Sequence, residues 1–263
     1  MAGMPFVADV SYYPAACISC LFFLFSFKIV SPKLSQTWIP GYNFLAPDKQ
    51  VEWNSRINSN VHCALVNTMV VYALLMDDEL HRDPIWANSA VVKYECAIVV
   101  GYMASDQIIM SVYHFATGSE YLLYLLHHGA TIYAYYYVMT YSTFPYFANF
   151  RLLCEFSTPF VNQRWFMDAL GCKRSSPAFI ANGLGLTVAF FLVRIASIPF
   201  YWHKVYTVYG TDYYWSVGNI HYVMVTSCVT LDILNVFWFS KLLKGARKVL
   251  MNKNQNTIQA KMN

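Results

Sequence analysis

Long uninterrupted runs of apolar residues constrain this chain more than any other feature. Residues 15–30, 61–76 and 179–196 each approach the roughly 20 residues that an α-helix needs to cross a bilayer. The composition agrees, because 57% of the 263 residues are hydrophobic and only 12% are charged. The runs lack the sustained alternation of a membrane β-barrel. The sequence therefore predicts an all-α, multi-pass membrane protein.

Glycine, proline and polar clusters divide the chain into seven predicted transmembrane helices. Their approximate ranges are 11–30, 55–77, 94–115, 119–141, 146–168, 178–203 and 216–243. The fifth helix is the most expensive to place in lipid, because it contains Arg151, Glu155, Asn162 and Arg164. Its polar residues are therefore expected to face other helices.

Basic residues outside the predicted helices favour seven spans with a cytosolic C-terminus. In that topology eleven of them lie on the cytosolic side: Lys33, Lys49, Arg56, Lys173, Arg174, Lys241, Lys244, Arg247, Lys248, Lys253 and Lys261. Only Arg82, Lys93 and Lys204 lie on the opposite side. Cytosolic loops carry the excess of Lys and Arg in membrane proteins, so this asymmetry supports the count of seven.

Polar side chains recur on one face of each predicted helix from the second to the seventh. On the fourth helix Glu120, Tyr124, His127 and Thr131 share a stripe, whereas His128 lies about 100° to one side. The other residues expected to line a cavity are Arg56, Asn60, His62, Asp106, Glu155, Asn162, Arg194, His221 and Asp232. Because ionisable groups in a membrane usually face its protein interior, we expect six helices around a polar or amphipathic cavity, with the first helix outside.

Structural roles can explain several of these residues equally well. Arg151 and Glu155 are four residues apart and can form an ion pair within one helix. Arg56, at a helix end, can extend its charge to the membrane surface. Asp232 and Asn235 can hold helices together through hydrogen bonds. The stripes thus leave both a binding and a structural interpretation open.

The adjacent residues His127 and His128 are the candidate catalytic groups. A neutral histidine can take a proton from an amine or hydroxyl that attacks an acyl carbonyl, and a carboxylate can fix its tautomer. Asp106, Glu155 or Asp232 could supply that carboxylate. The alternative is a hydrogen-bonded pair that holds the helix bundle together.

The cysteines and histidines do not show metal-binding spacing. Adjacent histidines on a helix point about 100° apart, and no HxxxH pattern occurs. Cys17 and Cys20 form a CxxC pair, but no second pair accompanies it, so both are interpreted as small packing residues. We therefore expect no metal site and no bound cofactor.

Five segments carry a family resemblance. They are WNSRINSNVH at 53–62, GYMASDQI at 101–108, LLHHGATIYAY at 125–135, LLCEFSTPFVNQRW at 152–165 and RIASIPFY at 194–201. In these segments and their order the chain resembles the TLC-domain family of membrane proteins, which includes the ceramide synthases. The resemblance implies an N-terminal transmembrane helix and cytosolic loop over 1–46, a six-helix TLC domain over 47–248, and a basic, polar cytosolic tail over 249–263.

The resemblance also implies a location and a chemistry. It indicates an internal membrane, commonly the endoplasmic reticulum, and a link to lipid metabolism or lipid sensing. In ceramide synthases the matching histidines are needed to transfer an acyl chain from acyl-coenzyme A to a sphingoid amine, which maps onto His127 and His128. There a His-Asp-x-x-Asp segment follows on the next helix, where this chain retains only Glu155.

These observations predict an intramembrane lipid-binding protein that affects membrane lipid composition, without catalysis. The alternative is an acyl-coenzyme-A-dependent N-acyltransferase with His127 or His128 as general base and acyl-coenzyme A as co-substrate. A transporter is the third possibility, although the sequence lacks broken helices in two related halves. Membrane lipids are the expected partners, and no nucleic acid is expected.

Overall fold

The computed structural model describes the backbone of residues 7–114 and 117–262 and the side chains as far as Arg247. Within these residues all regular structure is helical, as the sequence predicted. The first half contains α1 (Tyr13–Phe25), η1 (Ser26–Val30), α2 (Ser31–Trp38), η2 (Pro40–Phe44), α3 (Pro47–Met76), α4 (Asp78–Arg82), α5 (Ala90–Tyr113) and α6 (Gly118–Tyr141). The second half contains α7 (Pro145–Leu152), η3 (Leu153–Ser157), α8 (Thr158–Ala169), α9 (Pro177–Phe190), η4 (Phe191–Ala196), α10 (Ser197–Val208), α11 (Asp212–Trp215) and α12 (Ile220–Met262).

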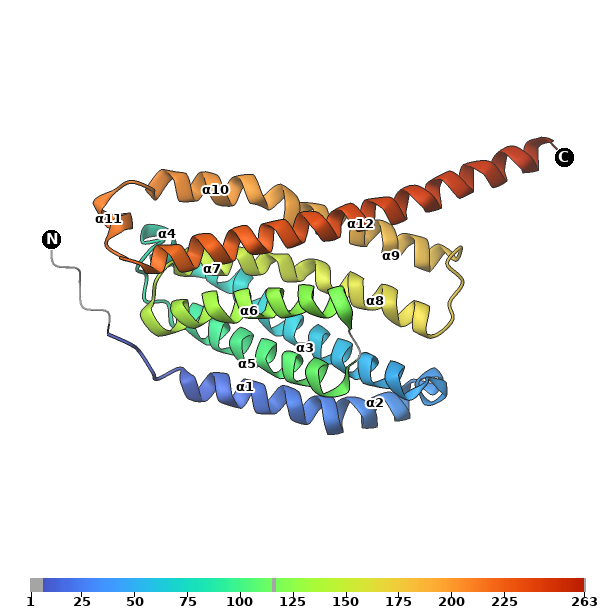
Figure 1. The fold of residues 1–263 in the computed structure, drawn as a ribbon, viewed down its shortest axis with the longest axis horizontal. Helices are drawn as coiled ribbons and strands as arrows, with labels where there is room; N and C mark the ends of the chain where they lie inside the picture. Colours follow the sequence, from blue (N-terminus) through green and yellow to red (C-terminus); the bar gives the residue numbers. More distant parts are fainter. Residues whose placement is uncertain (1–6, 115–116, 263) are drawn as a thin grey trace.

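Long helical segments lie at each of the seven predicted positions and run roughly along one direction, with α12 extending beyond the others (Figure 1). The first segment continues through the π-helical turn η1 to Trp38, and the second begins at Pro47. The predicted fifth helix is not continuous, because the 3₁₀ turn η3 separates α7 from α8. The side chains of the predicted tail 249–263 lie outside the described residues, although the backbone of α12 continues to Met262.

In the described part of the chain, five helical segments are long and apolar enough to cross a membrane. They are Tyr13–Trp38, Pro47–Met76, Ala90–Tyr113, Pro177–Val208 and Ile220–Arg247. The segments α6 and α7–α8 are not among them, so the count of seven spans stays a prediction. The coarser expectation of a helical protein with several membrane-spanning segments is supported.

Local signals set many helix boundaries. The Ser89 hydroxyl accepts a hydrogen bond from the Val92 N–H at the start of α5, and Ser176 caps α9 in the same way. Pro47 and Pro177 stand in the first turns of α3 and α9, where the missing N–H costs nothing. Helix α9 therefore begins within one residue of its predicted start at 178, whereas α3 begins at Pro47, eight residues before its predicted start at 55.

The helix α1 packs against α5 through a close backbone approach. A Cβ atom on Gly101 would lie 2.3 Å from the Ala16 carbonyl oxygen, so no larger residue fits there without movement. At the start of α1, Lys93 donates a hydrogen bond of 2.9 Å to Asp9. Hydrogen bonds from Ser11 and then from Lys93 lower the pKa of Asp9 to about 2. The first segment is thereby attached to α5 at two points.

Candidate functional site

A cavity of about 930 Å³ lies among the long helices. Its lining comes from α3, α5, α6, η3 with α8, α9 with η4, and α12, whereas α1 and α2 contribute none of the described lining residues. Apolar walls come from residues such as Phe179, Leu186, Phe190 and Trp238. Polar side chains gather on the inner surface of α3, α5, α6 and η3. The cavity is therefore amphipathic, as the sequence stripes predicted for a lipid site.

His128 on α6 is held between two side chains of α5. Its Nδ1 atom lies 3.0 Å from the Gln107 carbonyl oxygen, and its Nε2 atom lies 3.5 Å from an Asp106 carboxylate oxygen. The Gln107 amide nitrogen is directed to Ser111 and Tyr121, which leaves its oxygen to accept from His128. Because the imidazole is only 4% exposed and engaged on both sides, it links α5 to α6 as well as bordering the cavity.

His127 is placed differently, although it is the adjacent residue. It lines the cavity, and its ring lies edge-on to Trp238 of α12 with centroids 5.5 Å apart. Its Nδ1 atom is buried without a hydrogen-bond partner among the described residues. The Nδ1 of His127 is thus enclosed, which leaves Nε2 as the ring nitrogen that can meet a ligand in the cavity, whereas both ring nitrogens of His128 face side chains of α5.

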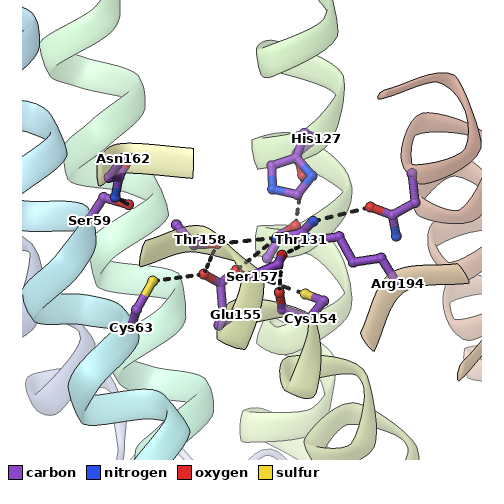
Figure 2. Close-up of polar contacts among 11 residues, drawn as sticks. Ser59, Cys63, His127, Thr131, Cys154, Glu155, Ser157, Thr158, Asn162 and Arg194 are labelled. Carbon is purple, nitrogen blue, oxygen red and sulfur yellow. Dashed lines mark hydrogen bonds and ion pairs between the residues drawn. The ribbon is translucent and has the colours of Figure 1, made fainter. Parts of the chain in front are cut away.

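Glu155 and Arg194 form the centre of a buried polar cluster below the cavity (Figure 2). One Glu155 oxygen accepts hydrogen bonds from Thr158 at 2.9 Å and Cys63 at 3.0 Å, and the other lies 4.0 Å from Arg194. Arg194 also donates to Ser157, Thr158 and Asn235. Its position in the π-helical turn η4 is a distortion that often marks functional segments.

Basic side chains line one part of the cavity, called here the basic end, on segments near the end of the molecule where α8 joins α9. These residues are Arg56, Arg164, Arg174, Lys241 and Arg247. Arg56 is paired with Glu52 at 2.8 Å and stacks over Trp165, and Arg174 is paired with Asp168. The other three, Arg164, Lys241 and Arg247, form no ion pair with a described residue, so the basic end of the cavity is electropositive.

The structure brings six of the ten predicted lining residues to the cavity. They are Arg56, Asp106, Tyr124, Glu155, Asn162 and Arg194, and the candidate catalytic residues His127 and His128 join them. The other four lie elsewhere: Asn60 is hydrogen-bonded to Asn162 beside the cavity, His62 is buried against Tyr102, His221 packs on Trp215, and Asp232 binds Arg151. Helical phase alone misplaced them because each has a partner on another segment or in a nearby turn.

One predicted ion pair is wrong. Arg151 does not pair with Glu155 along the helix, because the turn η3 interrupts the regular spacing between them. Arg151 instead donates to Asp232 of α12 at 2.5 Å, and Asp232 also accepts from the Trp202 indole. The result is a second, partly buried polar cluster, separate from the Glu155–Arg194 cluster. It supports the structural interpretation of Asp232.

Comparison with known proteins identifies the family. The TLC domain model matches residues 52–244. The chain belongs to the TLC-domain family. It is 42% identical over 228 residues to TLC domain-containing protein 4-B of Danio rerio, with 86% of each chain covered. It is 40% identical over 248 residues to TLC domain-containing protein 4 of Homo sapiens, covering 92% of this chain and 94% of that one. The resemblance drawn from the motifs is confirmed.

More distant TLC relatives extend the comparison. The chain is 25% identical over 245 residues to Topoisomerase I damage affected protein 4 of Saccharomyces cerevisiae, covering 88% of this chain and 83% of that one. No solved structure matches. The comparisons therefore place the chain in a family of membrane proteins linked to lipid metabolism or sensing, without assigning a reaction.

Within the TLC domain, the structure locates the departure from the ceramide-synthase pattern. Glu155, the one carboxylate left on the segment after the histidines, bonds to Cys63, Thr158 and Arg194 and not to either histidine. The carboxylate beside a histidine is Asp106 of α5. Of the three carboxylates that the sequence offered as partners, Asp106 is therefore the one that lies beside the histidine pair.

Sequence reasoning missed two parts of the site. Gln107 was not selected, although it follows Asp106 directly and its amide is what orients His128. Lys241 and Arg247 were counted as cytosolic charges, and Arg164 was expected to face other helices, but none of the three was selected as a cavity residue. The sequence did contain a signal for these residues, because basic residues occur near the predicted cytosolic ends of the second, fifth and seventh helices.

Proposed function

We propose that this TLC-domain protein binds one amphipathic lipid inside the membrane and thereby influences membrane lipid composition. The observation that carries this is the amphipathic cavity of about 930 Å³, near the upper end of the about 300–1,000 Å³ typical of small-molecule sites. Its aromatic and aliphatic walls suit an acyl chain. Its basic end suits an anionic headgroup, since three positive charges there have no ion-pair partner among the described residues.

The proposed arrangement in the membrane has seven spans. The segments α3, α5, α6, α7–α8, α9–α10 and α12 form six spans around the cavity, and α1–α2 packs outside against α5. The basic end of the cavity and the C-terminus then lie on the cytosolic side, as the distribution of Lys and Arg favours. We place the protein in the endoplasmic reticulum, on the strength of the family resemblance alone.

The test is a cavity-filling substitution with a matched control. Thr187 lines the cavity on α9, so Thr187→Trp is expected to reduce lipid that co-purifies with the protein by at least about tenfold. Val188, the next residue, is half exposed on the outer surface, so Val188→Trp should leave the retained lipid unchanged. Mass spectrometry of lipid extracted from purified protein in detergent measures both. Equal retention in the two variants would contradict a lipid site in this cavity.

The second candidate function is acyl transfer from acyl-coenzyme A to a lipid amine. One observation favours it: the His127 imidazole borders the cavity, and because its Nδ1 is enclosed, Nε2 is the ring nitrogen that can take the proton of the attacking amine and pass it to the departing coenzyme A thiolate. The basic end of the cavity would hold the phosphates of coenzyme A. In this mechanism His128, held by Asp106 and Gln107, positions α6 rather than taking the proton.

Turnover decides between the two candidates. The purified protein and a His127→Ala, His128→Ala double variant are incubated with acyl-coenzyme A and a panel of lipid amines. Amide product from the unsubstituted protein that disappears in the double variant would establish the acyltransferase. Absence of product, together with lipid retained by both proteins, would support binding without catalysis.

A further inference from the structure

Three potential metal-ligand side chains meet behind the cavity wall. His62 and Cys63 of α3 and Glu155 of η3 each offer one ligand atom, and these atoms lie within 4.8 Å of one another. The Cys63 sulfur lies 3.0 Å from a Glu155 oxygen (Figure 2). All three residues are buried, and Glu155 also lines the cavity. The cluster is thus enclosed by protein and borders the cavity.

The imidazole of His62 is unexplained by the protein alone. It has no exposed surface, and neither ring nitrogen has a hydrogen-bond partner in the described part of the chain. The ring is fixed by stacking on Tyr102, with centroids 3.9 Å apart and planes inclined by 16°. A buried polar atom without a partner destabilises the fold, so the His62 nitrogen nearest Cys63 and Glu155 calls for a ligand.

We propose that His62, Cys63 and Glu155 bind a zinc ion. Nitrogen, thiolate and carboxylate are the three donor types that zinc uses in proteins, and three protein ligands are typical of zinc sites that keep one position for water or a substrate. Zinc bonds of about 2.0–2.3 Å put tetrahedral ligand atoms roughly 3.5 Å apart. The Cys63–Glu155 distance of 3.0 Å is already near this value, and no two of the three ligand atoms are more than 4.8 Å apart, so the site can close around zinc by side-chain movements of about 1.3 Å or less.

The charge balance of the site identifies the fourth ligand by class. On binding, the Cys63 thiol releases its proton to solvent, and the zinc–sulfur bond replaces the hydrogen bond to Glu155. The two charges of zinc are then cancelled by the thiolate and the carboxylate. Arg194, 4.0 Å from Glu155, leaves one positive charge in a buried site. An anion, either hydroxide or an acidic group of a molecule in the cavity, is therefore the favoured fourth ligand.

The spacing in the sequence gave no sign of this set. His62 and Cys63 are adjacent, and Glu155 follows Cys63 by 92 residues. Adjacent residues on a regular helix diverge by about 100°, which argues against two ligands to one ion unless a third element lies between them. The turn η3 supplies that element, because it places Glu155 beside α3.

The test is metal content of the full-length protein, purified in detergent without chelators. Elemental analysis should find about one zinc per chain, and Co²⁺ replacing it should show the near-ultraviolet absorption of a cobalt–thiolate bond. His62→Phe keeps a ring against Tyr102, and Cys63→Ser keeps a hydrogen-bond donor for Glu155. Both are expected to lower bound zinc by at least about tenfold, since each removes one of three ligands.

Cys96→Ser provides the matched control, because Cys96 is equally buried on α5 but outside the cluster. It should keep its zinc. Zinc or the cobalt–thiolate absorption retained in Cys63→Ser, or no metal and no cobalt–thiolate absorption in the unsubstituted protein, would overturn the proposal. The cobalt measurement needs no variant, so it decides the matter even where a substitution prevents folding. Lipid retention is measured separately, so failure of the zinc site leaves the proposed lipid binding untouched.

Discussion

At the scale of single residues, the adjacent His127 and His128 have different surroundings and therefore different roles. His128 joins α6 to α5 through Asp106 and Gln107, whereas His127 presents a ring nitrogen that no described residue binds. The shared HH motif therefore hides two roles, one positional and one available to a ligand. Sequence position alone could not separate them, since the difference lies in what α5 offers opposite each ring.

Substituting each histidine by phenylalanine separates the roles. His128→Phe removes the partner of Asp106 Oδ2 and of the Gln107 side-chain oxygen, so we expect the free energy of unfolding to fall by about 1–3 kcal/mol. His127→Phe removes a buried nitrogen that has no partner, so it should change stability by less than about 1 kcal/mol. Unfolding of the purified variants by SDS in mixed micelles measures both. A larger loss for His127→Phe would contradict the assignment.

At the scale of helices, prediction worked where the signal is local. Apolar runs divided by glycine, proline and polar clusters located the helical segments. Prediction failed where a distant residue decides the local structure. The turn η3 separates Arg151 from Glu155, and their true partners, Asp232 and Arg194, lie on α12 and η4. Pairings of this kind depend on packing between helices, which periodicity within one helix does not encode.

The contact between α1 and α5 gives a prediction at the same scale. Gly101→Ala places a methyl group 2.3 Å from the Ala16 carbonyl oxygen, so α1 has to move and the free energy of unfolding should fall by about 1–3 kcal/mol. Gly129 on α6 has open space around it, and Gly129→Ala should be neutral or stabilising by up to about 1 kcal/mol. The same unfolding measurement compares the pair. Equal effects of the two substitutions would refute a tight α1–α5 approach at Gly101.

At the scale of the whole molecule, the burial of polar residues bears on how many helical segments can cross the membrane. The segments α6 and α7–α8 are not among the five apolar spans, yet they are about as long as the others and contain the histidines, Glu155 and Arg151. These residues face the cavity or pair with neighbouring helices rather than meeting lipid. A helix that buries its polar face in this way can cross a membrane with lower mean hydropathy than an isolated span.

The turn between α6 and α7 distinguishes seven spans from five. If the C-terminus is cytosolic, as proposed, this turn faces the side opposite the cytosol with seven spans. With α6 and α7–α8 outside the membrane, the turn faces the cytosol instead. In sealed microsomes a membrane-impermeant maleimide should label the exposed Cys172 of the α8–α9 loop without treatment. In a Cys172→Ala background, Ser142→Cys should react only after the membrane is permeabilised. The segments α6 and α7–α8 either both cross the membrane or both lie outside it. Labelling of Ser142→Cys in sealed microsomes would therefore show that neither crosses it, and the cavity that they line would then face the cytosol.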